Sequence, residues 1–149
     1  MMHPDTVPVR LLCCGDRGGF DVALIYNALR AYTAQGREIT VVHGAARGAD
    51  TLAGEAAKRC GFAVEEYPAD WRQWGKRAGP IRNQRMLDEG KPQIVHAFHD
   101  HILDSKGTRD MIYRALGAGL PVYLHQHGSD ALLIPESDRR SFAPYRKLS

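Results

Sequence analysis

The first segment with residues suited to chemistry follows a short apolar run, at residues 15–19 (GDRGG). Its glycines would let the backbone approach an anion closely, and a helix beginning beyond them would offer free N–H groups. Gly15 and Asp16 lie beside Arg17, which could add a charge-assisted hydrogen bond to a phosphate. A tight turn that needs glycine for its geometry alone explains the same residues, so this segment is weak evidence by itself.

A second segment repeats this composition at residues 43–50 (HGAARGAD), where Gly44, Arg47 and Gly48 precede a predicted helix. It is not a Walker loop, because no Gly-Lys-Ser/Thr follows, and the first segment does not continue as a full G-x-G-x-x-G pattern. Asp50 either binds a ribose hydroxyl or is favoured by the positive end of the helix. The residues leave both explanations open.

The third segment, residues 67–83 (YPADWRQWGKRAGPIRN), contains both tryptophans and several cations. An aromatic ring beside guanidinium groups suits a base and its phosphate. The alternative is that the tryptophans cover the core beneath a long loop. The density of cations favours ligand binding, because long loops in compact domains are usually functional. The ligand contacts predicted here are Trp71, Lys76, Gly79 and Asn83.

The fourth segment is residues 104–110 (DSKGTRD), before another predicted helix. Gly107 and Thr108 would place backbone amides and a hydroxyl at the helix start, which is a ready anion site. Asp110 is predicted in the first helical turn, where the helix dipole favours a carboxylate that has no catalytic role. The fourth segment therefore predicts a phosphate site and leaves the role of Asp110 open.

Predicted strands and helices alternate through most of the chain and would position these four segments. The strands are expected at residues 9–14, 38–43, 62–67, 94–98 and 121–124, with a short sixth at 131–135. The helices are expected at about 22–29, 49–60, 81–89 and 108–117, with a long polar segment at 68–80. Strands joined by helices pair in parallel through right-handed crossovers.

This alternation predicts an α/β fold: one Rossmann-like doubly wound domain with a mainly parallel sheet and helices on both faces. The expected strand order is 3-2-1-4-5. In such sheets, ligands bind at the carboxyl ends of the strands where the order reverses, here between the first and fourth strands. The four segments should therefore converge on that crevice.

Composition predicts one globular domain over residues 1–149, with a core at about 8–135 and a solvated basic tail at 136–149. The basic residues of this tail are Arg139, Arg140, Arg146 and Lys147. A hydrophobic content of 44% and a charged content of 25% disfavour disordered and membrane classes. No apolar run is long enough to cross a bilayer, and the N-terminal residues do not resemble a signal peptide, so we expect a cytoplasmic location.

Cysteines and histidines give no sign of a metal site or a cofactor. The odd count of three cysteines, with Cys13 and Cys14 adjacent and Cys60 ending a helix, predicts reduced structural thiols. The histidines considered as metal ligands are His96, His99, His101, His125 and His127. On strands and their ends this spacing alternates faces and does not define a tetrahedral site. We therefore expect neither metal nor cofactor.

Together the four segments resemble the SLOG superfamily of Rossmann-like proteins, specifically its YspA-like (YAcAr) branch. The matching stretches are residues 14–17 (CGDR), 43–53 (HGAARGADTLA), 68–86 (PADWRQWGKRAGPIRNQRM) and 106–111 (KGTRDM). The superfamily includes the Lonely Guy-type phosphoribohydrolases, which remove the base from cytokinin nucleotides, and the DNA-binding protein DprA. The resemblance thus implies a ligand related to nucleotides or nucleic acid.

In the phosphoribohydrolases, a PGGxGTxxE motif holds phosphate and supplies an acid, and an arginine from an Arg-Lys pair assists. Gly107 and Thr108 match the Gly-Thr of this motif, and Asp110 lies one residue before the acidic position. Arg82 matches the arginine, with Asn83 in place of the lysine. The resemblance therefore implies that Arg82 and Asp110 are the catalytic residues, if the chain is an enzyme.

Two functions follow from this resemblance. As an enzyme, the chain would cleave the N-glycosidic bond of a nucleotide, with Asp110 stabilising positive charge on the ribose or orienting water. As a non-enzymatic module, it would sense or sequester a nucleotide-type small molecule. Two departures from the motif favour this second function: the acid is shortened, and Asp104 and Ser105 replace the two leading glycines.

A nucleic-acid partner is not expected, because the net charge is only +3 and no basic stripe is present. Relatives commonly pair through their helices, so a homodimer is also compatible with the resemblance.

Overall fold

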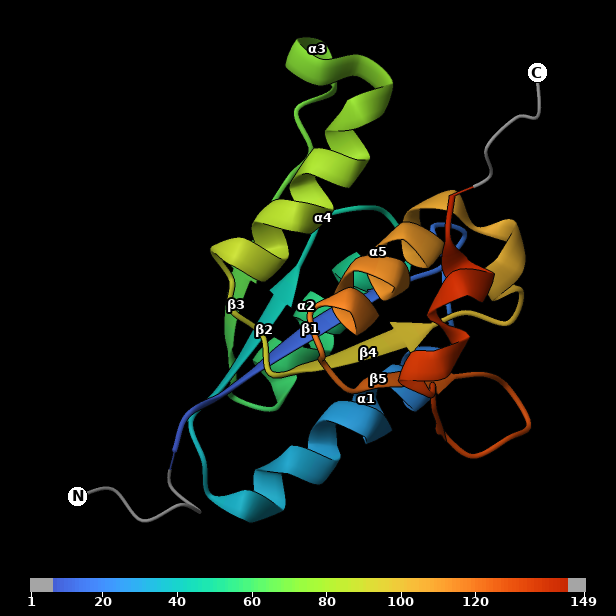
Figure 1. Ribbon diagram of the computed structural model, residues 1–149. Coiled ribbons are helices and arrows are strands. Elements are labelled where there is room, and N and C mark those ends of the chain that lie inside the picture. Colours follow the sequence, from blue (N-terminus) through green and yellow to red (C-terminus); the bar gives the residue numbers. More distant parts are fainter. Residues whose placement is uncertain (1–6, 145–149) are drawn as a thin grey trace, which may run out of the picture.

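The computed structural model describes residues 7–144, in which six strands form one sheet in the order β3-β2-β1-β4-β5-β6 (Figure 1). The strands are β1 (Val9–Gly15), β2 (Ile39–His43), β3 (Ala63–Glu66), β4 (Ile94–Phe98), β5 (Val122–His125) and β6 (Leu132–Leu133). The first five strands pair in parallel, and β6 runs antiparallel to β5. The predicted order is therefore confirmed, and β2 and β4 lie on opposite sides of β1.

Helices cover both faces of the sheet, which confirms the predicted Rossmann-like α/β class. The α-helices are α1 (Val22–Arg30), α2 (Ala49–Arg59), α3 (Trp71–Trp74), α4 (Ala78–Asp88) and α5 (Lys106–Gly117). The 3-10 helices are η2 (Ala31–Gln35), η3 (Gly75–Arg77), η4 (Ile102–Asp104) and η5 (Glu136–Phe142). Over the described part of the chain, none of these helices has the length and apolar character needed to cross a membrane.

The central strand β1 divides the core in two, because successive side chains of a strand point to opposite faces. Leu11 and Cys13 pack with α1 and α2, whereas Leu12 and Cys14 pack with α4 and α5. Burial on both faces explains why residues 11–14 of β1 are all apolar. Burial also raises the pKa of the Cys13 and Cys14 thiols, so they act as small apolar side chains.

Helix α2 approaches the sheet closely because its inner face consists of small residues. Ala49, Ala53 and Ala57 are fully buried against β1 and β2. A Cβ on Gly54 would lie 2.7 Å from Nε2 of His43, so glycine leaves room for this imidazole at the end of β2. The close approach sets the position of the loop between β2 and α2.

The polar segment at 68–80 is not the long loop that we predicted. It forms α3, η3 and the start of α4, which begins at Ala78 and not at about residue 81. The Asp70 carboxylate caps α3 by accepting a hydrogen bond from the backbone N–H of Gln73 at 3.0 Å. A single helical turn has no periodicity for a sequence pattern to detect, and Pro80 is tolerated in the first turn of α4. Figure 1 shows α3 projecting beyond the sheet.

The predicted solvated tail at 136–149 is wrong for its described part, because η5 packs on α5 and Phe142 is buried. The Arg139 guanidinium lies 4.0 Å from the centre of the Tyr113 ring and donates to the Tyr113 carbonyl at 3.0 Å. Arg140 lies within η5, whereas Arg146 and Lys147 lie outside the described residues. The core therefore extends beyond residue 135, since cations stacking on aromatic rings can cover an apolar surface.

Candidate functional site

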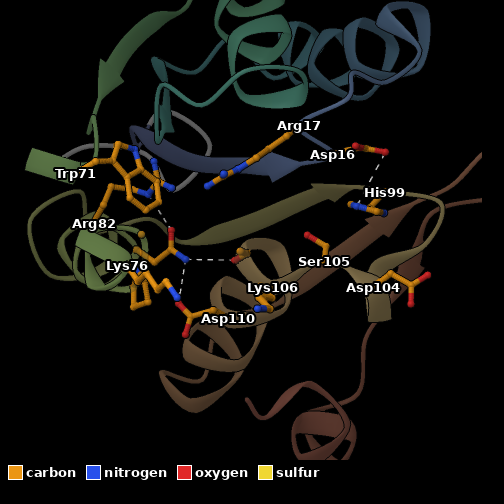
Figure 2. Close-up of a pocket in the computed structure, with 14 residues that line it drawn as sticks. Asp16, Arg17, Trp71, Lys76, Arg82, His99, Asp104, Ser105, Lys106 and Asp110 are labelled. Carbon is orange, nitrogen blue, oxygen red and sulfur yellow. Dashed lines mark hydrogen bonds and ion pairs between the residues drawn. The ribbon is translucent and has the colours of Figure 1, made fainter. Parts of the chain in front are cut away.

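A cavity of about 640 Å³ opens at the carboxyl ends of β1 and β4, where the strand order reverses. Its walls come from the loop after β1, from α3 and α4, and from the start of α5 (Figure 2). The predicted site residues that line it are Asp16, Arg17, Trp71, Lys76, Gly79, Arg82, Asn83, Gly107 and Asp110. The crevice expected from the topology therefore exists and collects residues from distant parts of the chain.

Three cations of this cavity have no ion-pair partner among the described residues. Arg17, Lys76 and Lys106 line it, and none of the three forms an ion pair with any residue between 7 and 144. The Asp16 carboxylate accepts a hydrogen bond from the backbone N–H of Gly18 at 2.8 Å. The lining of the cavity therefore suits an anionic group.

One side-chain amide connects the two predicted catalytic residues. Asn83 Oδ1 accepts from Arg82 Nε at 3.0 Å, and Asn83 Nδ2 donates to Asp110 Oδ2 at 2.9 Å. Arg114 Nε donates to the same Asp110 oxygen at 2.8 Å. Asp110 Oδ1 makes no hydrogen bond within the described residues. The carboxylate is thus held by one oxygen while the other is left for a ligand or water.

Asp110 does not lie in the first turn of α5, as we had predicted. The helix begins at Lys106, so Asp110 is its fifth residue and belongs to the second turn. The helix dipole acts mainly on charges in the first turn, so it does not explain this aspartate. The partners of Asp110 are instead Arg114, one turn further along α5, and Asn83 of α4.

Arg82 is fixed inside the wall of the cavity. It is buried, and its Nη1 donates to the Gly44 carbonyl in the loop after β2. Burial lowers the pKa of Arg82, and the nearby Asp50 carboxylate acts in the opposite direction. Arg82 therefore joins the loop after β2 to helix α4 and keeps its guanidinium at the base of the site.

The Asp50 carboxylate is bonded within its own loop. It is buried, and its Oδ2 accepts from the backbone N–H groups of Gly44 at 3.0 Å and Ala46 at 3.4 Å. Burial raises the pKa of Asp50 to about 6, although Arg82 and these hydrogen bonds oppose the shift. Asp50 does not line the main cavity, and these contacts make it a positioning residue for the loop.

Two other residues predicted to bind the ligand, Gly44 and Arg47, do not line the main cavity either. They line a neighbouring cavity of about 250 Å³.

The glycines of the site differ in what surrounds them. A Cβ on Gly15 would lie 2.2 Å from the Phe98 carbonyl oxygen, and one on Gly48, where φ is +76°, would lie 2.1 Å from that of Asp16. Packing between backbone segments therefore explains both glycines without a ligand. A Cβ on Gly107 would meet nothing within 4 Å. The hydroxyl of Thr108 donates to the Gly15 carbonyl at 3.2 Å, so it binds the protein and not the cavity.

Comparisons with known proteins identify the family. The chain is 37% identical over 119 residues to the gene 61 protein of Mycobacterium phage D29, an alignment that covers 76% of this chain and 93% of that protein. A family model described as the YspA, cpYpsA-related SLOG family matches residues 9–74. The chain belongs to this SLOG family. The predicted resemblance is therefore confirmed.

The SLOG match includes the loops after β1 and β2 and ends at Trp74, so Arg82 and Asp110 lie beyond the matched residues. The crystal structure of MurG from Acinetobacter baumannii aligns with a TM-score of 0.52 and 12% identity. The alignment covers 80% of this SLOG chain but only 35% of MurG. Such a likeness shows a shared fold and nothing more.

Sequence reasoning missed His99, which lines the cavity of this SLOG protein and is buried. Its spacing from the other histidines suggests only a metal ligand. Between residues 7 and 144, the histidine, cysteine, aspartate and glutamate side chains form no cluster of three or more that could hold a metal ion. His96 instead hydrogen-bonds to Tyr32 and His125, both at 2.8 Å, and burial lowers the pKa of His96 to about 3. The signal for His99 was its position directly after β4.

Proposed function

We propose that this SLOG protein binds a nucleotide-type ligand in the 640 Å³ cavity, with a phosphate group at the start of α5. The observation that carries the proposal is the set of cations without an ion-pair partner in residues 7–144, Arg17, Lys76 and Lys106, around the open wall at Gly107. The first N–H groups of a helix have no acceptor within the helix. At α5 the Ser105 hydroxyl accepts from the Thr108 N–H at 3.3 Å, which leaves the N–H groups of Lys106 and Gly107 to bind an anion. The Gly107 position leaves room for a phosphate to approach these groups.

Trp71 supports a base as the second part of the ligand. Its side chain is 49% exposed and lines the cavity, so its ring offers a surface for stacking. The Arg17 guanidinium lies 5.6 Å from the centre of this ring. An aromatic ring beside an arginine suits both parts of a nucleotide, because the ring stacks on the base and the guanidinium pairs with phosphate.

Calorimetric titration tests the proposal with the four ribonucleoside 5′-monophosphates, the matching nucleosides and inorganic phosphate. We expect at least one monophosphate to bind about tenfold or more tightly than its nucleoside, because charge-assisted hydrogen bonds to phosphate are strong. Trp71→Ala should weaken binding of the monophosphate and leave binding of inorganic phosphate unchanged. If no monophosphate binds, or if nucleosides bind equally well, the proposal is wrong.

A second candidate function is cleavage of the N-glycosidic bond of the bound nucleotide. Its support is the Asp110 carboxylate, which Asn83 and Arg114 hold through Oδ2 at the wall of the cavity. In this reaction the C1′–N bond breaks with its electron pair moving to the base, and water oriented by Asp110 Oδ1 adds to C1′. The base and the water exchange the remaining proton with the solvent. Arg82 would hold the ligand and offset developing negative charge.

Chromatography of nucleotides incubated with the protein separates the two functions. Catalysis predicts release of free base, and Asp110→Asn should lower the rate by about 100-fold or more. This variant keeps an amide oxygen that can accept from Asn83 and Arg114, and thermal melting provides the control for folding. Recovery of a bound nucleotide unchanged after long incubation would instead favour a module that senses or sequesters it.

A further inference from the structure

Asp16 and His99 face each other at one end of the cavity, as Figure 2 shows. They are the first residues after β1 and β4, whose last residues, Gly15 and Phe98, are paired in the sheet. The backbone N–H of Asp16 donates to the Phe98 carbonyl at 2.9 Å. The sheet itself therefore holds these two side chains next to each other, at the point where the strand order reverses.

The hydrogen bond on one side of the His99 ring determines what the other side offers. Nδ1 of His99 accepts from the backbone N–H of His101 at 2.9 Å. A neutral imidazole that accepts at Nδ1 carries its proton on Nε2. Nε2 lies 4.0 Å from Asp16 Oδ2. The cavity therefore has a directed N–H donor beside a carboxylate acceptor.

The Asp16 carboxylate is also oriented by the backbone. Its Oδ1 accepts from the N–H of Gly18 at 2.8 Å, which leaves Oδ2 on the side of His99. The 4.0 Å between Oδ2 and His99 Nε2 is too long for a direct hydrogen bond. An oxygen atom set to one side of the line that joins them can lie about 2.8 Å from both.

A hydroxyl group matches this pair of atoms. Its oxygen can accept from Nε2–H of His99 while its hydrogen is donated to Oδ2 of Asp16. A fully ionised phosphate has no proton to donate to a carboxylate and is repelled by its charge, so the pair favours a hydroxyl over a phosphate. We propose that Asp16 and His99 bind a ribose hydroxyl of the ligand. This inference rests on the proposed nucleotide binding.

The inference also gives the ligand a direction. Figure 2 shows Trp71 and Lys76 at the end of the cavity opposite Asp16 and His99, with Lys106 between them. A nucleotide would thus have its sugar hydroxyl at the Asp16–His99 end and its base toward Trp71. The phosphate would lie near Lys106, at the start of α5.

The first test changes the ligand and leaves the protein intact. The four ribonucleoside 5′-monophosphates are titrated beside their 2′-deoxy and 3′-deoxy counterparts. We expect one deoxy series to bind about tenfold more weakly, because the donor and acceptor of the protein would be left unpaired. Equal binding of all three series would overturn the inference but not the proposed function. Failure of every series to bind would overturn the proposed function, and this inference with it.

Two variants of His99 then separate its structural contact from its contact with the ligand. His99→Asn keeps an oxygen near Nδ1 that can accept from His101, but it removes the donor at Nε2. His99→Gln places an amide donor near Nε2. We expect His99→Asn to lose the preference for ribose and His99→Gln to keep most of it. A purely structural role predicts the reverse, and that result would overturn the inference.

Asp16→Asn provides the matching change on the acceptor. Its amide oxygen can still accept from Gly18, so the turn is kept, while an NH₂ group replaces Oδ2. We expect this variant to bind ribonucleotides and the sensitive deoxy series equally well. Thermal melting of each variant provides the control for folding. An unchanged preference for ribose in Asp16→Asn would show that the carboxylate does not accept the hydroxyl.

Discussion

The start of α2 and the start of α5 both have a cation, a glycine and a following aspartate, at residues 47–50 and 106–110. At α2 the glycine packs against the backbone of the loop after β1, and the aspartate is buried. At α5 a Cβ on the glycine would meet nothing within 4 Å, although the Gly107 carbonyl accepts from Asn83 Nδ2 at 3.2 Å, and the aspartate lies at the wall of the main cavity. Similar residues thus form a packed scaffold in one place and an open binding surface in the other.

The difference follows from where the aspartate falls in each helix. Asp50 is the second residue of α2, so its carboxylate turns back to the N–H groups of the preceding loop. Asp110 is the fifth residue of α5, so it pairs with Arg114 and with Asn83 of the neighbouring helix. A carboxylate that satisfies the loop amides leaves them unavailable to a ligand. Glycine and cation patterns alone therefore do not distinguish a scaffold from a binding surface.

The largest effect is expected for Gly48→Ala, on the scaffold side of the comparison. Its Cβ would lie 2.1 Å from the Asp16 carbonyl oxygen, at a φ of +76°. The free energy of unfolding, measured by urea denaturation, should fall by about 3 kcal/mol or more. Gly61→Ala is the matched control, because Gly61 has a φ of +79° and nothing within 4 Å. This control should lose only about 1 kcal/mol, and equal losses would contradict the packing argument.

The next effect concerns the buried carboxylate of the scaffold. Because burial raises the pKa of Asp50 to about 6, the folded protein holds this proton more tightly than the unfolded chain does. Asp50 should therefore make the fold more stable by about 2 kcal/mol as the pH falls from about 7 to about 4.5. The measurement is the difference in unfolding free energy between the wild type and Asp50→Asn at both pH values. A difference that stays constant, or that changes in the opposite direction, would be inconsistent with a buried Asp50 carboxylate.

On the open side, Lys106→Gln should weaken binding of a nucleoside monophosphate by about tenfold and leave folding unchanged. Lys106 has no carboxylate partner within residues 7–144, so its replacement should break no ion pair of the fold. The exposed Lys58 in the last turn of α2 supplies the control. Lys58→Gln changes the net charge equally and should leave the affinity nearly unchanged. Equal losses in both variants would indicate that only net charge matters.

The smallest effect is expected for Gly107→Ala, and its two readouts should move in opposite directions. A Cβ there meets nothing within 4 Å, and alanine is favoured over glycine in a helix. The free energy of unfolding should therefore rise by about 0.5–1 kcal/mol. Affinity for the nucleotide should fall by about threefold, because a methyl group would stand on the wall facing the phosphate. A loss of stability would mean that Gly107 belongs to the scaffold, as Gly48 does.

Most of the sheet could be predicted because its central strands are short, mainly apolar segments, and glycine loops follow β1 and β2. Residues 94–98 were predicted as a strand and form β4 with those bounds. The single-turn helix α3 and the 3-10 helix η5 could not be predicted, because neither is long enough to show a helical period. The burial of Phe142 depends on contact with α5, which local patterns do not report.

The candidate site was predictable to the level of which loops meet, but not of which atoms they present. The sequence predicted ligand binding for Asp50 and catalysis for Asp110, and only the hydrogen bonds of the structure separated a loop-positioning residue from a cavity-lining one. His99 was missed because its donor direction depends on a backbone contact with His101. The ligand itself and the roles of Arg82 and Asp110 stay predictions until the titrations are made.

The sequence by itself determined the alternation of strands and helices, and with it the edge of the sheet where the glycine segments gather. Those features follow from hydrophobic periodicity and from the handedness of parallel crossovers, which are local or general rules. Only the tertiary structure decided that Gly48 is packed while Gly107 is open. The physical reason is that such contacts join atoms from segments far apart in the chain, so their distances exist only after the helices have packed on the sheet.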